Sequence, residues 1–318
     1  MRQSLDQTLP YVEAQPPVPA ARVILSTLRA DFFPGSIIPV VLGSLLALRA
    51  TGSWHWGLFG WTLAGAVLMH AAANVSNDYF DYRSGNDAAN RTFIRPFTGG
   101  SRTVLQGLIT PRGLALLAAT CFLGFLVVAA YLTWRVGPQI LWLGAVGAAT
   151  GILYTAPPVR LVARGLGEPV VALDFAVLPT LGAYFVQTGT WSWLPVWASL
   201  PVAILILAVL FVNQFPDYEA DKSVGKNNWV VRLGRPRAAV LDGWLMAAWP
   251  VALILAVTVG GAPKVLLVGL TGIPVAFLAA RALLRNYEAP DKLKPACALT
   301  VALHAGVGIL MCAALLVR

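Results

Sequence analysis

Two short stretches of the chain combine acids with asparagines in a pattern suited to binding metal cations. The first, 74-NVSNDYFDYRSGND-87, holds three aspartates and three asparagines. The second, 213-NQFPDYEAD-221, places Asp217 and Asp221 shortly after Asn213. Each stretch closes a long apolar run, where carboxylates are unusual. Their position therefore calls for a chemical reason.

The spacing of the acids predicts two rows of oxygen ligands. Asp78 and Asp81 are three residues apart, and Asp217 and Asp221 are four apart, so each pair shares one face of a helix. An asparagine lies one turn earlier in each stretch. The negative end of a helix dipole disfavours such acids by about 0.3–1 kcal/mol each. Two facing rows need cations between them, and Mg²⁺ prefers oxygen ligands and often binds substrate phosphates as well.

The composition predicts that these rows are held by an all-α polytopic membrane protein. Of the 318 residues, 58% are hydrophobic and 12% charged, with a mean hydropathy of +0.71, whereas about a quarter of the residues in soluble domains are charged. Nine apolar runs are long enough to cross a bilayer. They cover 32–50, 56–77, 114–134, 138–156, 169–187, 194–213, 239–259, 263–283 and 297–316. The echo between the two acidic stretches predicts a pseudo-symmetric bundle of nine transmembrane helices with a cytoplasm-facing cavity.

The distribution of positive charge predicts the orientation. With the N-terminus in the cytoplasm, 19 of the 23 Lys and Arg residues lie on the cytoplasmic side, which is the positive-inside bias. The net charge of +9 is therefore topological, and no nucleic-acid partner is expected. We expect a polar cytoplasmic tail at 1–22, a single membrane-embedded domain at 23–318, and a C-terminus outside the cytoplasmic (inner) membrane.

The expected chemistry follows from acids, cations and lipid at one place. Metal and loop Arg and Lys residues would hold a polyphosphate, and a site at helix ends would take a phosphate head with a hydrocarbon tail. An isoprenyl diphosphate fits this description. Neutralising its leaving diphosphate eases rupture of the allylic C–O bond, and aromatic rings stabilise the resulting cation by about 0.5–2 kcal/mol each. The candidate rings are Tyr79, Tyr154, Tyr184, Phe211 and Tyr218.

Three stretches together resemble the UbiA superfamily of intramembrane prenyltransferases, which has nine transmembrane helices and two aspartate-rich motifs. They are 77-NDYFDYRSGND-87, 154-YTAPPVRLVARGLGE-168 and 217-DYEADKSVGK-226. The likeness runs from 26-STLRADFFPGSIIPVVLG-43 to the last span. The gap between Asp81 and Asp87, the loop 98-TGGSRTVLQGLIT-110 and the RGLGE at 164–168 are most similar to the 1,4-dihydroxy-2-naphthoate polyprenyltransferases of menaquinone biosynthesis.

This resemblance implies Mg²⁺-dependent transfer of an isoprenyl chain to a ring carbon of an aromatic acceptor, giving demethylmenaquinol when a dihydroxynaphthoate also loses its carboxylate. It implies that Asn77, Asp78 and Asp81 ligate one Mg²⁺ and that Asp217 and Asp221 ligate a second, with the four aspartates as the catalytic residues. The expected substrate-binding residues are Asn74, Asp87, Arg91, Arg102, Tyr154, Arg160, Arg164, Asn213, Lys222 and Lys226.

Some alternatives stay open on the sequence. The acceptor could instead be 4-hydroxybenzoate or homogentisate, and the prenyl chain length and oligomeric state are undetermined. In a different class, a membrane transporter would also have pseudo-symmetric halves, although its acids would lie at mid-bilayer rather than at one face. Asp174 lies within an expected span, where it is either functional or a hydrogen-bonded residue near a helix end.

Overall fold

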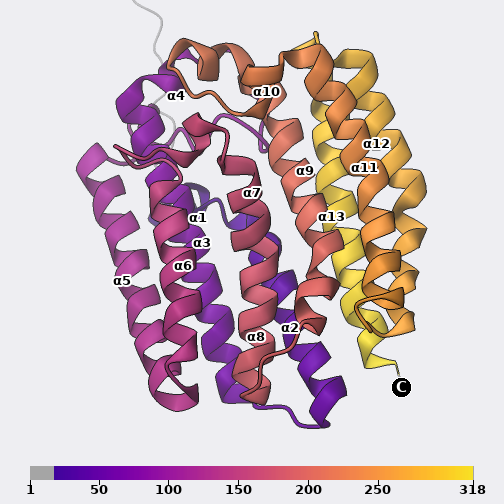
Figure 1. Ribbon diagram of the computed structural model, residues 1–318. Coiled ribbons are helices and arrows are strands. Elements are labelled where there is room, and N and C mark those ends of the chain that lie inside the picture. Colours follow the sequence, from indigo (N-terminus) through magenta and orange to yellow (C-terminus); the bar gives the residue numbers. More distant parts are fainter. Residues whose placement is uncertain (1–17, 318) are drawn as a thin grey trace, which may run out of the picture.

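The computed structural model describes residues 18–317, and this part of the chain folds into a helical bundle without strands (Figure 1). The polar tail expected at 1–22 lies mostly outside the described residues, and α1 begins within it. The α-helices are α1 (Ala20–Leu28), α2 (Pro34–Thr51), α3 (Trp56–Ser84), α4 (Asn86–Ala89), α5 (Pro111–Val136), α6 (Gln139–Leu153), α7 (Gly167–Ala172), α8 (Leu178–Thr188), α9 (Leu194–Ser223), α10 (Trp229–Leu233), α11 (Arg235–Thr258), α12 (Ile273–Asn286) and α13 (Lys294–Leu316).

Eight helical segments of the described chain are long and apolar enough to cross a membrane. They contain α2, α3, α5, α7 with α8, α9, α11, α12 and α13, and each matches one of the expected spans. The remaining expected span, 138–156, forms α6, a 15-residue apolar helix that is shorter than the ~20 residues of a typical span. Large apolar side chains such as Leu116, Trp142 and Phe277 point outward, as in helices that face lipid. The protein is therefore an integral membrane protein.

The interior is built around α9, which supports the second acidic stretch. α9 packs against α11 and α13, and α2 packs against α8. Along the last turns of α9, Phe211, Val212 and Phe215 are fully buried in a cluster with residues of α10, α11 and α13. Because this face of α9 is fixed by close packing, its opposite face presents polar residues in a defined position.

Both acidic stretches are helical, because α3 and α9 continue beyond the apolar runs that the sequence shows. The expected spans 56–77 and 194–213 become helices that end at Ser84 and Ser223. α3 is followed by Gly85, whose φ of 80° is the left-handed conformation favoured just after a helix C-terminus. The short helices α4 and α10 follow at the same end of the bundle, and α13 finishes at the opposite end (Figure 1). The two acidic stretches therefore meet at one end.

Candidate active site

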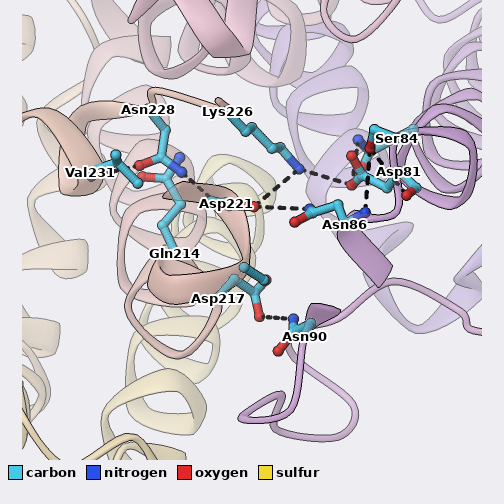
Figure 2. Close-up of polar contacts among 12 residues, drawn as sticks. Asp81, Ser84, Asn86, Asn90, Gln214, Asp217, Asp221, Lys226, Asn228 and Val231 are labelled. Carbon is cyan, nitrogen blue, oxygen red and sulfur yellow. Dashed lines mark hydrogen bonds and ion pairs between the residues drawn. The ribbon is translucent and has the colours of Figure 1, made fainter. Parts of the chain in front are cut away.

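Acids from α3 and α9 face each other across a polar cavity at this end of the bundle (Figure 2). Its wall includes the glycine loop 98–100 and the side chains of Asn77, Asp81, Asp87, Asp217, Asp221 and Lys226. The cavity thus brings together eight of the residues expected from the sequence, because Tyr154 and Asn213 line it together with these six side chains. Asn86, Asn90 and Asn228 complete the polar lining.

Lys226 joins the two rows of acids. Its Nζ lies 2.8 Å from Asp81 Oδ2 and 3.7 Å from Asp221 Oδ1 (Figure 2). Burial alone would lower the pKa of Lys226, but the nearby Asp81 and Asp221 outweigh it and raise the pKa well above its usual range. Asn77 donates to the same oxygen of Asp81 at 3.2 Å. A permanent cation therefore lies between the two carboxylate rows.

Three asparagines hold the acids of α9 in place. Asn86 Nδ2 donates to Asp221 Oδ1 at 2.9 Å, and Asn90 Nδ2 donates to Asp217 Oδ1 at 2.7 Å. Asn86 and Asn90 are four residues apart, as are the two aspartates that they bind, so α4 matches one turn of α9. On the other side, Asn228 donates to Asp221 Oδ2 at 2.7 Å. These bonds orient the carboxylates and leave further lone pairs free to accept from or coordinate a ligand.

Asp78 lies apart from Asp81, although the sequence predicts one row. Asp78 is 3% exposed and does not line the polar cavity. Its Oδ2 accepts from the main-chain nitrogen of Ser101 at 3.0 Å, and a Cβ on Gly100 would come within 2.8 Å of its Oδ1. Residues three apart on a helix point about 60° apart, which is enough to send one carboxylate into the cavity and the other beneath the loop. Asp78 thus anchors the glycine loop.

Asp87 does line the cavity, although it lies beyond the end of α3. It is 5% exposed, and burial, together with the negative charges of Asp81 and Asp78, raises its pKa to about 8. A cation beside it would therefore be needed to keep this carboxyl ionised at neutral pH. Arg102 does not supply that cation directly, because its Nη1 donates at 2.8 Å to the main-chain carbonyl of Asp87 rather than to the carboxylate.

The loop arginines have separate positions. Arg102 stacks on the ring of Phe93, with 4.2 Å from the guanidinium carbon to the ring centroid. Arg95 donates to the carbonyls of Gly100 and Ser101 at 2.9 and 2.8 Å. Both side chains therefore shape the loop over the cavity. Arg91, expected at the diphosphate, is exposed and lines none of the cavities described here.

The other basic residues expected to bind substrate also lie in different places. Arg164 donates to the carbonyls of Val159 and Pro158, so it stabilises its own loop. Arg160 lines an adjoining cavity whose wall also contains Asp81 and Lys226. Lys222 is exposed and lies over the ring of Tyr218 at 5.7 Å. Among these three side chains, only Arg160 is close to the polar cavity.

A second cavity continues from the polar cavity toward the membrane interior. This middle cavity shares Arg29, Asn77, Tyr154 and Asn213 with the polar cavity. Asn213 Oδ1 is buried without a hydrogen-bond partner among the described residues. Asn74 also lines the middle cavity, where its Nδ2 donates to the carbonyl of Leu28 at 3.2 Å. A ligand with a polar head and a ring or hydrocarbon body could therefore occupy both cavities at once.

A third, apolar cavity continues from the middle one between α3, α5, α6 and α8. It shares His70, Asp174 and Phe175 with the middle cavity and is otherwise lined by small and apolar side chains. The three cavities form a path of adjoining cavities from the acids into the bundle, each sharing wall residues with the next. Of the expected aromatic residues, only Tyr154 lies on this path. Tyr184 and Phe211 belong to core clusters, and Tyr79 and Tyr218 line none of the three cavities.

The RGLGE segment at 164–168 makes hydrogen bonds that connect two loops. Glu168 is fully buried, and its Oε1 accepts from Trp229 N at 2.7 Å and from Gln214 Nε2 at 3.0 Å. Trp229 Nε1 donates to the carbonyl of Gly165 at 2.8 Å, and Gly165 has a φ of 73° with Arg232 Nε 2.8 Å from where a Cβ would be. The segment therefore fastens the loop before α7 onto the loop after α9.

Several site residues were missed from the sequence. Arg29 lines both the polar and the middle cavities, yet it precedes the first span and belongs to no acidic stretch. Asn90 and Asn228 lie in loops, where asparagine is common. For Asn90, the one signal in the sequence is its spacing of four residues from Asn86, which equals the spacing of Asp217 and Asp221 on α9.

The chemistry of the cavity fits a divalent cation that is bound partly by substrate. No group of three or more His, Cys, Asp or Glu side chains within 18–317 is close enough to form a metal site alone. Each wall instead offers one or two carboxylates with amide oxygens beside them. Magnesium is commonly bound in this way, through one or two carboxylates plus substrate phosphates. The position of Lys226 between the walls shows that they accommodate positive charge.

Comparison with known proteins decides the family. The model of the UbiA prenyltransferase family matches residues 36–312. The chain belongs to the UbiA prenyltransferase family. It is therefore a membrane-bound prenyltransferase, which confirms the resemblance drawn from the acidic stretches and favours an enzyme over a transporter.

Similar proteins extend this result. The chain is 29% identical to a 2-carboxy-1,4-naphthoquinone phytyltransferase of Synechocystis, over 93% of this chain and 94% of that one. It is 27% identical to a 1,4-dihydroxy-2-naphthoate octaprenyltransferase of Bacillus subtilis, over 98% and 96%. Among solved structures, a UbiA homolog from Archaeoglobus fulgidus bound to DMAPP and Mg²⁺ shares the fold with a TM-score of 0.62 and 16% identity, covering 93% of this chain and 99% of that one.

Proposed function

We propose that this prenyltransferase catalyses Mg²⁺-dependent transfer of an isoprenyl chain from its diphosphate to 1,4-dihydroxy-2-naphthoate. The observation that carries the proposal is the polar cavity, in which acids of α3 and α9 face each other around Lys226. The fold neighbour bound to DMAPP and Mg²⁺ supports the metal and the diphosphate. The activities for which the Synechocystis and Bacillus subtilis relatives are named support the acceptor.

We infer that two Mg²⁺ ions bind with the diphosphate, one at each wall. Asn77, Asp81 and Asp87 would hold the first, and Asp217 and Asp221 the second. This assignment replaces Asp78 with Asp87, because Asp87 lines the cavity and Asp78 lies beneath the loop. When bound, the metal supplies positive charge that stabilises the leaving diphosphate.

The chain's own residues complete the site. Lys226 would bind the diphosphate oxygens, and its high pKa keeps it charged throughout the reaction. Tyr154 lies where the polar and middle cavities join, so its ring would face the allylic carbon as the C–O bond breaks. The apolar cavity would take the hydrocarbon chain and exclude water from the cation. Attack by the acceptor ring on the allylic carbon would then form the new C–C bond in place of the broken C–O bond, and loss of the acceptor's carboxylate as CO₂ would leave the aromatic naphthoquinol.

Arg29 is the cation best placed for an acceptor carboxylate. It lines both cavities, whereas Arg164 binds loop carbonyls. With its carboxylate at Arg29, an aromatic acceptor in the middle cavity would present its ring to the allylic carbon. Arg160, in the adjoining cavity, would contribute positive charge beside the diphosphate.

The acceptor assignment is tested by competition between substrates. Purified protein in detergent receives geranylgeranyl diphosphate, Mg²⁺ and equal concentrations of 1,4-dihydroxy-2-naphthoate and 4-hydroxybenzoate. We expect a prenylated, decarboxylated naphthoquinol as the main product. Predominant prenylation of 4-hydroxybenzoate would keep the reaction class and overturn the acceptor.

A further inference from the structure

A polar pair within the membrane region has no part in the site described so far. Asp174 and His70 lie where the middle cavity meets the apolar cavity, and each lines both. Asp174 is the seventh residue after the start of its span at Gly167, which places it about 10 Å along the helix. Ionisable residues at such depth are costly and commonly mark function.

The backbone around Asp174 is also unusual. Leu173–Val177 forms a π-helical segment between α7 and α8. Such segments are rare and frequently occur at functional sites. The segment also carries Phe175, whose ring packs edge-on against His70 at 4.7 Å between centroids. The local irregularity therefore positions both members of the pair at the junction.

In each of these two side chains, one polar atom is hydrogen-bonded to the protein and the other is not. Asp174 Oδ1 accepts from Thr150 Oγ1 of α6 at 2.9 Å. His70 Nδ1 shares a hydrogen bond with Ser36 Oγ of α2 at 2.8 Å. Within 18–317 these are the only side-chain hydrogen bonds of the two residues, so Asp174 Oδ2 and His70 Nε2 have no partner, although both residues line the cavities. Two oriented polar atoms thus lack partners in an otherwise apolar junction.

We propose that Asp174 forms a subsite for the ring hydroxyl of the acceptor that lies farthest from its carboxylate, with His70 beside it. This inference rests on the proposed function. Arg29 lies at the polar end of the middle cavity, and Asp174 and His70 lie at the opposite end, where that cavity meets the apolar one. A hydroquinone carboxylate is polar at both ends, so it matches this arrangement. Asp174 Oδ2 accepts the hydrogen bond of the far hydroxyl and sets the ring's orientation.

A hydrocarbon chain alone does not explain the pair. An isoprenyl chain has no hydrogen-bond donor, and apolar residues at positions 70 and 174 would contact it at lower cost. A hydroxylated ring pairs with the carboxylate and offsets that cost. The subsite would thereby discriminate against acceptors that lack the second hydroxyl, because they leave the carboxylate without a partner.

The test compares two acceptors in two proteins. The acceptors are 1,4-dihydroxy-2-naphthoate and 1-hydroxy-2-naphthoate, which lacks the far hydroxyl, with geranylgeranyl diphosphate and Mg²⁺ held in excess. The proteins are the full-length chain and Asp174→Leu, with kcat/KM measured for each pair. The analogue is less electron-rich and reacts more slowly everywhere, so the diagnostic quantity is the change in the ratio between acceptors.

We expect Asp174→Leu to reduce the preference for the dihydroxy acceptor by roughly 10- to 100-fold, the range that one hydrogen bond to a carboxylate supplies. Thr150→Val, which removes only the partner of Oδ1, is expected to reduce it less. The matched control is Asp242→Leu. Asp242 is another buried acid of a spanning helix, but it lines none of the three cavities, and its substitution should leave the ratio unchanged.

The alternative outcomes are distinct. If Asp174→Leu slows both acceptors equally and the ratio persists, the subsite is wrong and the proposed function stands. If the unsubstituted protein prenylates neither naphthoate, the proposed function fails and the subsite fails with it. Should Asp174→Leu not fold, Asp174→Asn carries the same comparison, and an unchanged ratio in that variant overturns the subsite.

Discussion

The ammonium nitrogen of Lys226 lies 2.8 Å from Asp81 Oδ2, joining residues 145 positions apart in the chain. Lys226 also lies 3.7 Å from Asp221, so one side chain contacts the acids of both α3 and α9. The contact connects the two acidic stretches whose similarity is visible in the sequence. It also separates Lys226 from the neighbouring Lys222, which points outward over Tyr218.

Lys226 is expected to matter far more than Lys222. Lys226→Gln removes the cation between two carboxylate rows, and loss of one partner of a buried ion pair costs several kcal/mol. We expect kcat/KM for the isoprenyl diphosphate to fall at least about 100-fold. Lys222→Gln, a matched change at an exposed position, should reduce it by less than about threefold. Equal losses in steady-state assays of the two variants would contradict this distinction.

The aspartates of the cavity wall are expected to bind Mg²⁺, whereas Asp78 is expected to stabilise the glycine loop. Asp81→Asn, Asp217→Asn and Asp221→Asn remove charge from the cavity wall, so the Mg²⁺ concentration for half-maximal activity should rise by about tenfold or more. Asp78→Asn removes charge beneath the glycine loop. It should reduce thermal stability while leaving that Mg²⁺ concentration within about twofold. Magnesium titrations of the four variants decide this, and an Asp78→Asn titration that shifts like the others would restore Asp78 as a ligand.

Gly100 is expected to be less replaceable than Gly225. Both have positive φ values, 63° and 69°, so alanine costs about 1–2 kcal/mol of backbone strain at either position. Only at Gly100 would the new Cβ meet a charged atom, Asp78 Oδ1 at 2.8 Å, whereas nothing lies within 4 Å at Gly225. We expect Gly100→Ala to lower the Tm in detergent by about 3 °C or more beyond Gly225→Ala. Indistinguishable melting curves would show that the loop yields freely.

The site is expected to face the cytoplasm. The three native cysteines are buried, so single cysteines can be introduced at exposed loop positions with little background. Asn227→Cys lies in the loop after α9, and Thr190→Cys lies between α8 and α9 at the opposite end. In intact cells, a membrane-impermeant maleimide should label only Thr190→Cys. Labelling of Asn227→Cys instead would reverse the proposed orientation.

Much of the fold can be predicted from the apolar runs alone, because a membrane-spanning helix needs about 20 apolar residues in a row whatever it packs against. The runs at 56–77 and 194–213 located α3 and α9 correctly but ended too early. Hydropathy stops where the polar residues begin, whereas the helices continue to Ser84 and Ser223 because their last turns pack against α4 and α10.

The site was less predictable, for a physical reason. Spacing along a helix tells which side chains share a face. Asp78 and Asp81 point only about 60° apart, so their spacing places them on the same face. What separates them is the loop at 98–101, whose path depends on Arg95 and Phe93. Charge alone also cannot distinguish Lys226 from Lys222 or Arg160 from Arg91. Arg29 reaches the site through tertiary contacts that no local pattern encodes.

The central claim is that the polar cavity uses Mg²⁺ to activate an isoprenyl diphosphate toward an aromatic ring. The most direct measurement follows prenylated product and released diphosphate together, using purified protein, geranylgeranyl diphosphate and 1,4-dihydroxy-2-naphthoate with Mg²⁺ or with EDTA. We expect both products to form in equal amounts with Mg²⁺, to vanish with EDTA and to return when Mg²⁺ is restored. Product formation that persists in EDTA, or that is unaffected by Asp217→Asn and Asp221→Asn together, would contradict the account.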